Sequence, residues 1–182
     1  MQPYLERICV MAPTPADIAA AIQDSAAFKA WKKKHPQGYL SHFFCPITAD
    51  CELKSAWEVG FYDQASGKMT VFAYGRQVTV KGDEDEVFKK PEQAVEELKL
   101  PSVKILFPKA VDVFAEHVEE LFPKAGRGDG FVTLQTTDSK TLWNFTFITK
   151  SLKFINIKVN AETGTVESHL DMDLIDRGKI RK

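Results

Sequence analysis

The sequence lacks the motifs that would assign it to a common catalytic or membrane class. No stretch approaches the ~20 consecutive apolar residues that a membrane-spanning helix needs, so we expect no membrane-embedded helix. No GxxxxGK(S/T) loop is present, which excludes the nucleotide hydrolases that bind phosphate through that loop. The three cysteines include no CxxC pair, which argues against a zinc site built on paired cysteines and against a disulfide scaffold.

An excess of charge of either sign is also missing. The chain has 24 basic and 25 acidic residues and a net charge of −1. This balance leaves no electrostatic footprint for nucleic acid or for an anionic membrane, so we expect neither as a partner. The N-terminal residues lack the basic start and apolar core of a secretory signal. Together with the odd number of cysteines, this predicts a cytoplasmic protein.

What the sequence does contain is a repeated strand pattern. Within 182 residues, of which 44% are hydrophobic, a shift of 86 positions aligns alternating apolar residues of the first half with those of the second. The aligned pairs are Trp57–Trp143, Val59–Phe145, Phe61–Phe147, Met69–Ile155, Val71–Ile157, Ala73–Val159 and Val80–Val166. Alternating apolar positions line one face of a strand, so the pattern predicts two copies of one small unit.

A helix and four strands are predicted for the first copy. Thr14 is a suitable N-cap and Pro15 suits the first helical position. Apolar residues continue at helical spacing to Trp31, and Pro36 ends the helix. Four runs of strand-forming residues follow, at Tyr39–Cys45, Ala56–Tyr62, Lys68–Tyr74 and Arg76–Lys81.

The second copy repeats this order after a charged connector at 83–100, in which we expect a short helix at Pro91–Leu98. A second long helix begins near Pro108. The strands of the second copy are expected at Phe131–Thr136, Leu142–Thr149, Phe154–Asn160 and Thr165–Asp171. We therefore predict an α+β fold of two tandem α-β-β-β-β units, residues 1–82 and 101–182, each with a helix packed on an antiparallel sheet.

Residues 100–175 carry a family likeness. A helix is followed by a strand containing Trp143-Asn144-Phe145 and by a closing hairpin whose turn reads Asn160-Ala161-Glu162-Thr163-Gly164. The Asn160 side chain can bond to its own turn, and Gly164 can take a positive φ. These features resemble the PepSY family, a small α+β domain related in shape to cystatins, and residues 14–81 resemble a divergent first copy. The resemblance implies a non-catalytic module that binds or restrains peptidases.

An insertion distinguishes the two copies. The first copy carries about six residues more than the second before its tryptophan, and the surplus lies around Cys45–Cys51. An insertion confined to one copy is a candidate for a feature particular to this protein. Cys45 and Cys51 allow three interpretations: a regulatory thiol pair, half of a metal site, or two ordinary free thiols.

No arrangement of residues typical of catalysis is recognisable. The histidines, His35, His42, His117 and His169, have no nucleophile or paired carboxylate at a typical spacing, so we expect them at the surface or hydrogen-bonded. We therefore predict no enzyme, no cofactor and no metal. For the equivalent Trp57 and Trp143 two interpretations stay open: buried core residues, or an aromatic platform for a ligand.

These observations favour a non-enzymatic binding or regulatory module. We expect it to engage a protein or peptide through a sheet face or a strand edge, as a monomer or a homodimer. The alternative is a small-molecule-binding protein or an enzyme with a pocket on the concave face of a sheet. For that alternative, the candidate ligand-face residues are His42, Glu58 and Tyr62.

Overall fold

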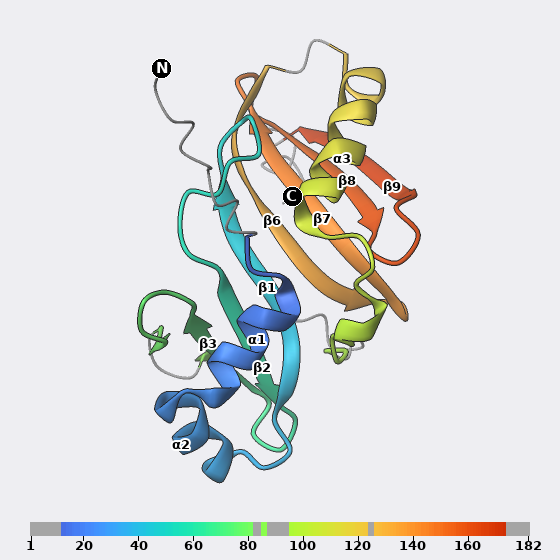
Figure 1. The fold of residues 1–182 in the computed structure, drawn as a ribbon. Helices are drawn as coiled ribbons and strands as arrows, with labels where there is room; N and C mark the ends of the chain where they lie inside the picture. Colours follow the sequence, from blue (N-terminus) through green and yellow to red (C-terminus); the bar gives the residue numbers. More distant parts are fainter. Residues whose placement is uncertain (1–11, 82–84, 87–94, 124–125, 174–182) are drawn as a thin grey trace, which may run out of the picture.

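Figure 1 shows the chain in a computed structural model, which describes residues 12–81, 85–86, 95–123 and 126–173. The helices are α1 (Pro15–Asp24), α2 (Ala26–Lys34) and α3 (Phe107–Leu121), with a 3-10 turn η1 at Leu100–Ser102. The strands are β1 (Tyr39–Ile47), β2 (Glu58–Asp63), β3 (Lys68–Ala73), β4 (Thr79–Val80), β5 (Asp85–Glu86), β6 (Arg127–Thr137), β7 (Lys140–Thr149), β8 (Lys153–Asn160) and β9 (Val166–Asp173). Every predicted strand overlaps an observed one, whereas β5 was predicted as part of the connector.

The strands form one continuous antiparallel sheet in the order β4-β3-β2-β1-β6-β7-β8-β9, with β5 paired to β3. The two halves of the chain meet at the β1–β6 pair, which runs from His42 opposite Gln135 to Ile47 opposite Gly130. The predicted fold class, two separate helix-on-sheet units, is therefore wrong. The alternating pattern shows which side chains share a face, but it does not show that the edges of β1 and β6 pair and merge the sheets.

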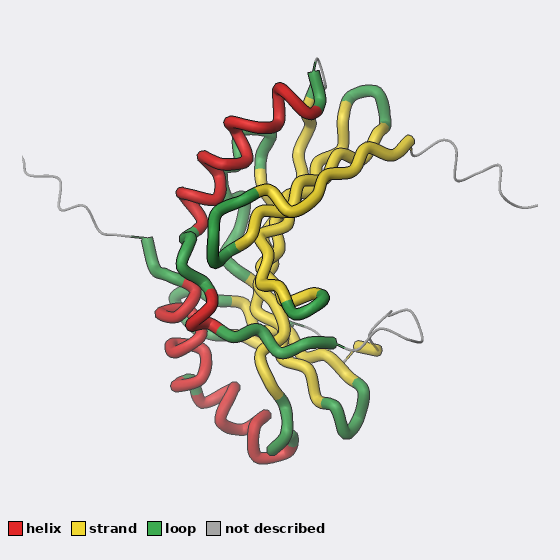
Figure 2. Tube along the Cα trace, turned by 90° about the vertical axis from the view of Figure 1, so that its right-hand side faces the viewer, coloured by secondary structure: helices red, strands yellow, loops and turns green. Residues whose placement is uncertain are grey.

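The hydrophobic core is likewise continuous. Figure 2 shows a curved sheet with the helices along its outer side and no described helix on the opposite face. Phe28 of α2 packs on Phe61 at a centroid distance of 4.7 Å, and Phe114 of α3 packs on Phe145 at 4.9 Å. Both pairs belong to a single cluster of buried side chains, so the two sequence copies share one core.

The first predicted helix is divided at Ser25. The backbone of Ser25 is extended, with φ −67° and ψ 151°, so α1 ends before this residue and α2 begins after it. The Ser25 hydroxyl donates to the Ile22 carbonyl at 2.6 Å and accepts from the Phe28 N–H at 3.1 Å, so one side chain caps both helices. Among the described helices, none is long and apolar enough to cross a membrane.

The connector predicted at 83–100 is described only in part. The first four residues of the predicted helix Pro91–Leu98 lie outside the described ranges, and its last four residues form no helix. Instead, Leu98 is buried, and its N–H donates to the Leu40 carbonyl at 2.9 Å. This end of the connector is therefore packed against β1 rather than solvated.

Candidate functional site

A cavity of about 600 Å³ lies on the helix-covered side of the sheet, where α1 and α3 both begin. Its walls include five aromatic side chains, Phe43, Trp57, Tyr74, Phe107 and Trp143. The ring of Trp57 lies 5.5 Å from that of Phe107 and 6.1 Å from that of Trp143, measured between centroids. The walls therefore present aromatic faces and edges to whatever occupies the cavity.

The two tryptophans that the sequence repeat relates to each other meet in this cavity. Trp57 immediately precedes β2, and Trp143 lies in β7 on the other side of the β1–β6 pair. Their exposed fractions are 8% and 0%. The interpretation as buried core residues is confirmed. Both side chains also line the cavity, and the aromatic platform for a ligand stays a prediction.

The insertion of the first copy supplies another wall. After β1, the chain turns at Thr48–Cys51 and pairs back through an isolated bridge between Ile47 and Leu53. This brings Leu53, Ser55 and Ala56 to the cavity. Leu53 is 41% exposed, and Leu106, at the start of α3, is 37% exposed. Together with other exposed lining residues, such as Ala56 and Lys109, these two leucines mark the opening of the cavity.

The two helix N-termini at the cavity are built differently. At α1, the Thr14 hydroxyl accepts from the Asp17 N–H at 3.2 Å, and the Asp17 carboxylate accepts from the Thr14 N–H at 2.9 Å. The Thr14 hydroxyl also donates to the Asp17 carboxylate at 2.7 Å, and this bond, together with the one from the Thr14 N–H, lowers the pKa of Asp17. At α3, the N-cap is Leu106, which offers no side-chain hydrogen bond, and the first turn holds no acidic residue. Only α1 therefore carries its own cap and counter-charge.

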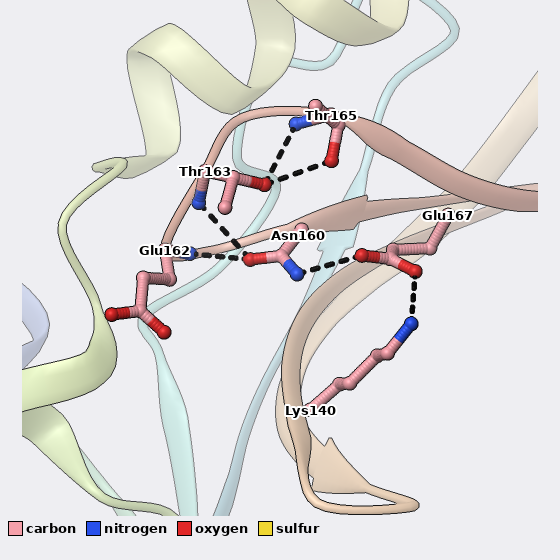
Figure 3. A network of polar contacts seen from close by, with 6 residues as sticks. All are labelled: Lys140, Asn160, Glu162, Thr163, Thr165 and Glu167. Atoms are coloured by element: carbon pink, nitrogen blue, oxygen red, sulfur yellow. Dashed lines mark hydrogen bonds and ion pairs between the residues drawn. The ribbon is translucent and has the colours of Figure 1, made fainter.

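The turn between β8 and β9 holds the chain that leads into α3. As Figure 3 shows, the Asn160 side-chain oxygen accepts from the N–H groups of Glu162 and Thr163, at 2.8 and 3.0 Å. Gly164 has φ +79°, so the turn predicted from the sequence is confirmed. The Ala161 carbonyl accepts from the N–H groups of both Lys104 and Ile105. This turn thereby fixes the segment just before Leu106.

The predicted ligand-face residues lie elsewhere. His42, Glu58 and Tyr62 belong to β1 and β2 on the helix-free face, because the alternating neighbours Phe43, Val59 and Phe61 are in the core. The alternative prediction placed a pocket on this concave face, but none of the three residues lines the cavity described above. A Cβ on Gly60 would come within 2.2 Å of the His42 ring, so this ring is packed down onto the sheet.

His42 also contacts a serine. The Ser41 hydroxyl lies 2.8 Å from His42 Nδ1 and donates to the Gly60 carbonyl at 3.0 Å. Burial lowers the pKa of His42 against the opposing effect of the Glu58 carboxylate. Ser41 itself is buried, so this contact gives a substrate no access to the hydroxyl and is structural.

The two cysteines of the insertion are both buried and free. Cys45 Sγ lies 3.3 Å from the Ser55 carbonyl. Burial raises the pKa of the Cys51 thiol to about 11, which keeps it protonated near neutral pH. This state suits a packed thiol better than a regulatory one. No group of three or more potential metal ligands occurs in the described part of the chain.

Sequence reasoning missed the residues that shape the cavity opening. Leu53, Leu106 and Lys109 are ordinary residues in the sequence, and they meet only because the two helices begin at the same place. One local signal was present: a leucine stands directly before Phe107-Pro108, where Ser, Thr, Asp or Asn is usual for an N-cap. An uncapped helix start needs another partner for its N–H groups.

The comparisons with known proteins give a fold and no family. No protein-family model matches the chain, and no curated protein matches it. Its structure is similar to the crystal structure of a candidate lipoprotein from Clostridium difficile 630, with a TM-score of 0.50 and 14% sequence identity. The match covers 80% of this chain and 90% of the other. At this identity the likeness concerns the fold alone.

Proposed function

We propose that this protein is a binding protein that takes an apolar small molecule into the cavity between α1 and α3. The observation that carries the proposal is the cavity itself, whose volume of about 600 Å³ is of the size of ligand sites. Five aromatic rings form its walls, and one such ring can bury a large apolar area of a ligand. The proposal corresponds to the small-molecule alternative from the sequence, with the pocket on the opposite face of the sheet.

Packing supports a binding role for this space. Protein interiors are close-packed and hold few voids larger than a water molecule. The core beside α3 follows this rule at the stacked rings of Phe114, Phe145 and Phe147, where the centroid distances are 4.9 and 5.1 Å. A ligand that covers the apolar walls would gain roughly 25 cal/mol for each Å² removed from water.

A free strand edge favours a second candidate function. β9 pairs only with β8 in the described sheet, and its residues Ser168–Asp171 are exposed. An extended peptide, or β9 of a second copy, can add a strand to such an edge. This matches the expectation of a protein or peptide partner, including the peptidase partner that the PepSY resemblance implies. Light scattering tests the homodimer: a mass that stays monomeric up to high concentration contradicts it.

The cavity is tested with N-phenyl-1-naphthylamine, an uncharged apolar probe that fluoresces when it leaves water. We expect saturable binding of one probe per chain. Ala56→Trp, which fills the cavity opening from an exposed position, should abolish this binding. Ala20→Trp places the same side chain on the exposed side of α1 and should leave binding unchanged. Equal binding by the parent and by Ala56→Trp, or no saturable binding at all, contradicts the proposal.

A further inference from the structure

We infer that the ligand of this cavity is an amphiphilic monocarboxylate, whose apolar body lies among the aromatic rings and whose carboxylate lies at the start of α3. The inference rests on the proposed function and adds the chemical class of the ligand. It follows from three hydrogen-bond donors at the cavity: the first N–H groups of α3, the ammonium of Lys109 and the indole N–H of Trp57.

The start of α3 supplies the first donors. In any α-helix the first N–H groups have no partner within the helix. At α3 the N-cap Leu106 provides no side-chain acceptor, and Pro108 has no N–H, which leaves the N–H groups of Phe107 and Lys109. Leu106, Phe107 and Lys109 all line the cavity. A carboxylate placed there would accept these bonds and would also be favoured by the dipole of this 15-residue helix.

Lys109 supplies a positive charge at the same point. Among the described residues that line the cavity it is the one charged side chain, and Asp and Glu do not occur there. Its side chain is 61% exposed, and its ammonium nitrogen lies 3.7 Å from Asp112 Oδ2, a long, solvent-exposed contact. The ammonium can therefore turn to a carboxylate at the opening without giving up a strong ion pair.

Trp57 is an independent observation that points the same way. The Trp143 indole N–H donates to the Ile105 carbonyl at 2.7 Å. For Trp57, no such bond occurs among the described residues, although only 8% of this residue is exposed. Its nitrogen is not among the enclosed polar atoms without a partner, so it reaches open space, and the space that Trp57 lines is the cavity. An indole N–H that opens into an apolar cavity can donate a hydrogen bond to an acceptor on a ligand.

The contrast with α1 explains why the anion belongs to the ligand. Both helices begin at the cavity, but α1 carries its own carboxylate in Asp17. The start of α3 has the same need and no acidic residue in its first turn. A bound carboxylate would do for α3 what Asp17 does for α1, and the apolar body attached to it would fill the space between the two helices.

The test compares three molecules with the same twelve-carbon chain, each below its micelle concentration: dodecanoate, dodecanol and dodecylammonium. Each is titrated against the N-phenyl-1-naphthylamine complex, and its affinity is read from displacement of the probe. We expect dodecanoate to bind at least about tenfold more tightly than dodecanol, since hydrogen bonds to a charged group are the stronger ones. We expect dodecylammonium to bind more weakly than dodecanol.

Two kinds of variant locate the carboxylate. Leu106→Asp provides α3 with a cap in its existing extended N-cap conformation, so the protein should become more stable while dodecanoate binding falls at least about tenfold. Leu106→Asn caps the helix without the charge, and dodecanol should bind these two variants with equal affinity. Lys109→Gln should weaken dodecanoate binding severalfold. Lys29→Gln, at a lysine of α2 that is 60% exposed and outside the cavity, should not.

The outcomes separate the inference from the proposed function. If dodecanol and dodecanoate displace the probe equally well in the parent protein, the carboxylate inference is overturned while the apolar site stands. If neither compound displaces the probe, or the probe does not bind, the proposed function itself fails. Unchanged dodecanoate affinity in Leu106→Asp also overturns the inference. The gain in stability expected for this variant shows that it is folded and that its α3 is capped, so misfolding cannot account for the result.

Discussion

The turn that holds the start of α3 should be vulnerable at a single residue, Asn160. Asn160→Ala removes the two hydrogen bonds that the side-chain oxygen accepts from the N–H groups of Glu162 and Thr163. A neutral hydrogen bond contributes roughly 0.5–1.5 kcal/mol, so the expected loss in free energy of unfolding is about 1–3 kcal/mol. Asn160→Ala also removes the part-buried bond that the Asn160 amide donates to the Glu167 carboxylate at 2.7 Å, and its loss adds to this amount because the acceptor is charged.

Urea unfolding followed by circular dichroism measures this loss. For a chain of this length each kcal/mol corresponds to roughly 2–4 °C in Tm, so a thermal melt should show the same change. Thr163→Ala is the matched control in the same turn. It removes the exposed contact between the Thr163 and Thr165 hydroxyls, at 2.8 Å, and a long bond from the Thr165 N–H, at 3.4 Å, and should cost less than about 0.5 kcal/mol.

The consequence for the cavity separates the turn from an ordinary surface loop. The Ala161 carbonyl holds the N–H groups of Lys104 and Ile105, so a loosened turn should also displace Leu106. We expect Asn160→Ala to weaken binding of the apolar probe under conditions in which the protein is still folded. The expected loss in free energy of unfolding is about 1–3 kcal/mol, so an Asn160→Ala variant within about 0.3 kcal/mol of the parent would refute the reasoning.

Three further predictions concern other parts of the structure. Gly60→Ala should destabilise the fold by about 1–3 kcal/mol, because its Cβ would meet the His42 ring at 2.2 Å, and His42→Ala in the same chain should restore part of the loss. Hydrogen bonds from Ser66 and His35 lower the pKa of Asp63 from 3.8. The contribution of the Asp63 carboxylate to stability should therefore be present above about pH 4 and be lost as the pH falls through the lowered pKa. In Asp63→Asn the free energy of unfolding should depend less on pH in this range, and an unchanged pH dependence contradicts this. In a Cys9→Ser variant, iodoacetamide at pH 8 should label Cys45 and Cys51 only after the protein is unfolded, because both thiols are buried and the pKa of Cys51 is about 11. Mass spectrometry measures the labelling, and rapid labelling of the native protein contradicts the prediction.

Local structure could be predicted from the sequence where side chains of one segment determine it. Alternation identified the strands, and the turn at Asn160–Gly164 follows from an Asx side chain and a glycine at the positions that need them. The division at Ser25 was missed because apolar spacing continues across it, although a serine that can cap both ways was present.

The arrangement of segments could not be predicted in the same way. Pairing of β1 with β6 depends on which strand edges meet, and periodicity carries no information about edges. The cavity depends in turn on that pairing, since it brings Trp57 and Trp143 to a centroid distance of 6.1 Å. His42, Glu58 and Tyr62 do share a face, but the cavity opens on the other one, so a ligand at these three residues stays a prediction.

The most direct test of the account is a proton–nitrogen correlation NMR spectrum of the three indole N–H groups during titration with dodecanoate. Trp31 donates to the Thr70 hydroxyl at 2.9 Å and lies outside the cavity, Trp143 donates to Ile105 within its wall, and the Trp57 N–H has no acceptor among the described residues. The account predicts that the Trp57 indole signal shifts most and saturably, that of Trp143 less, and that of Trp31 not at all. A Trp57 signal that does not move, or a shift of Trp31 as large as that of Trp57, would contradict it.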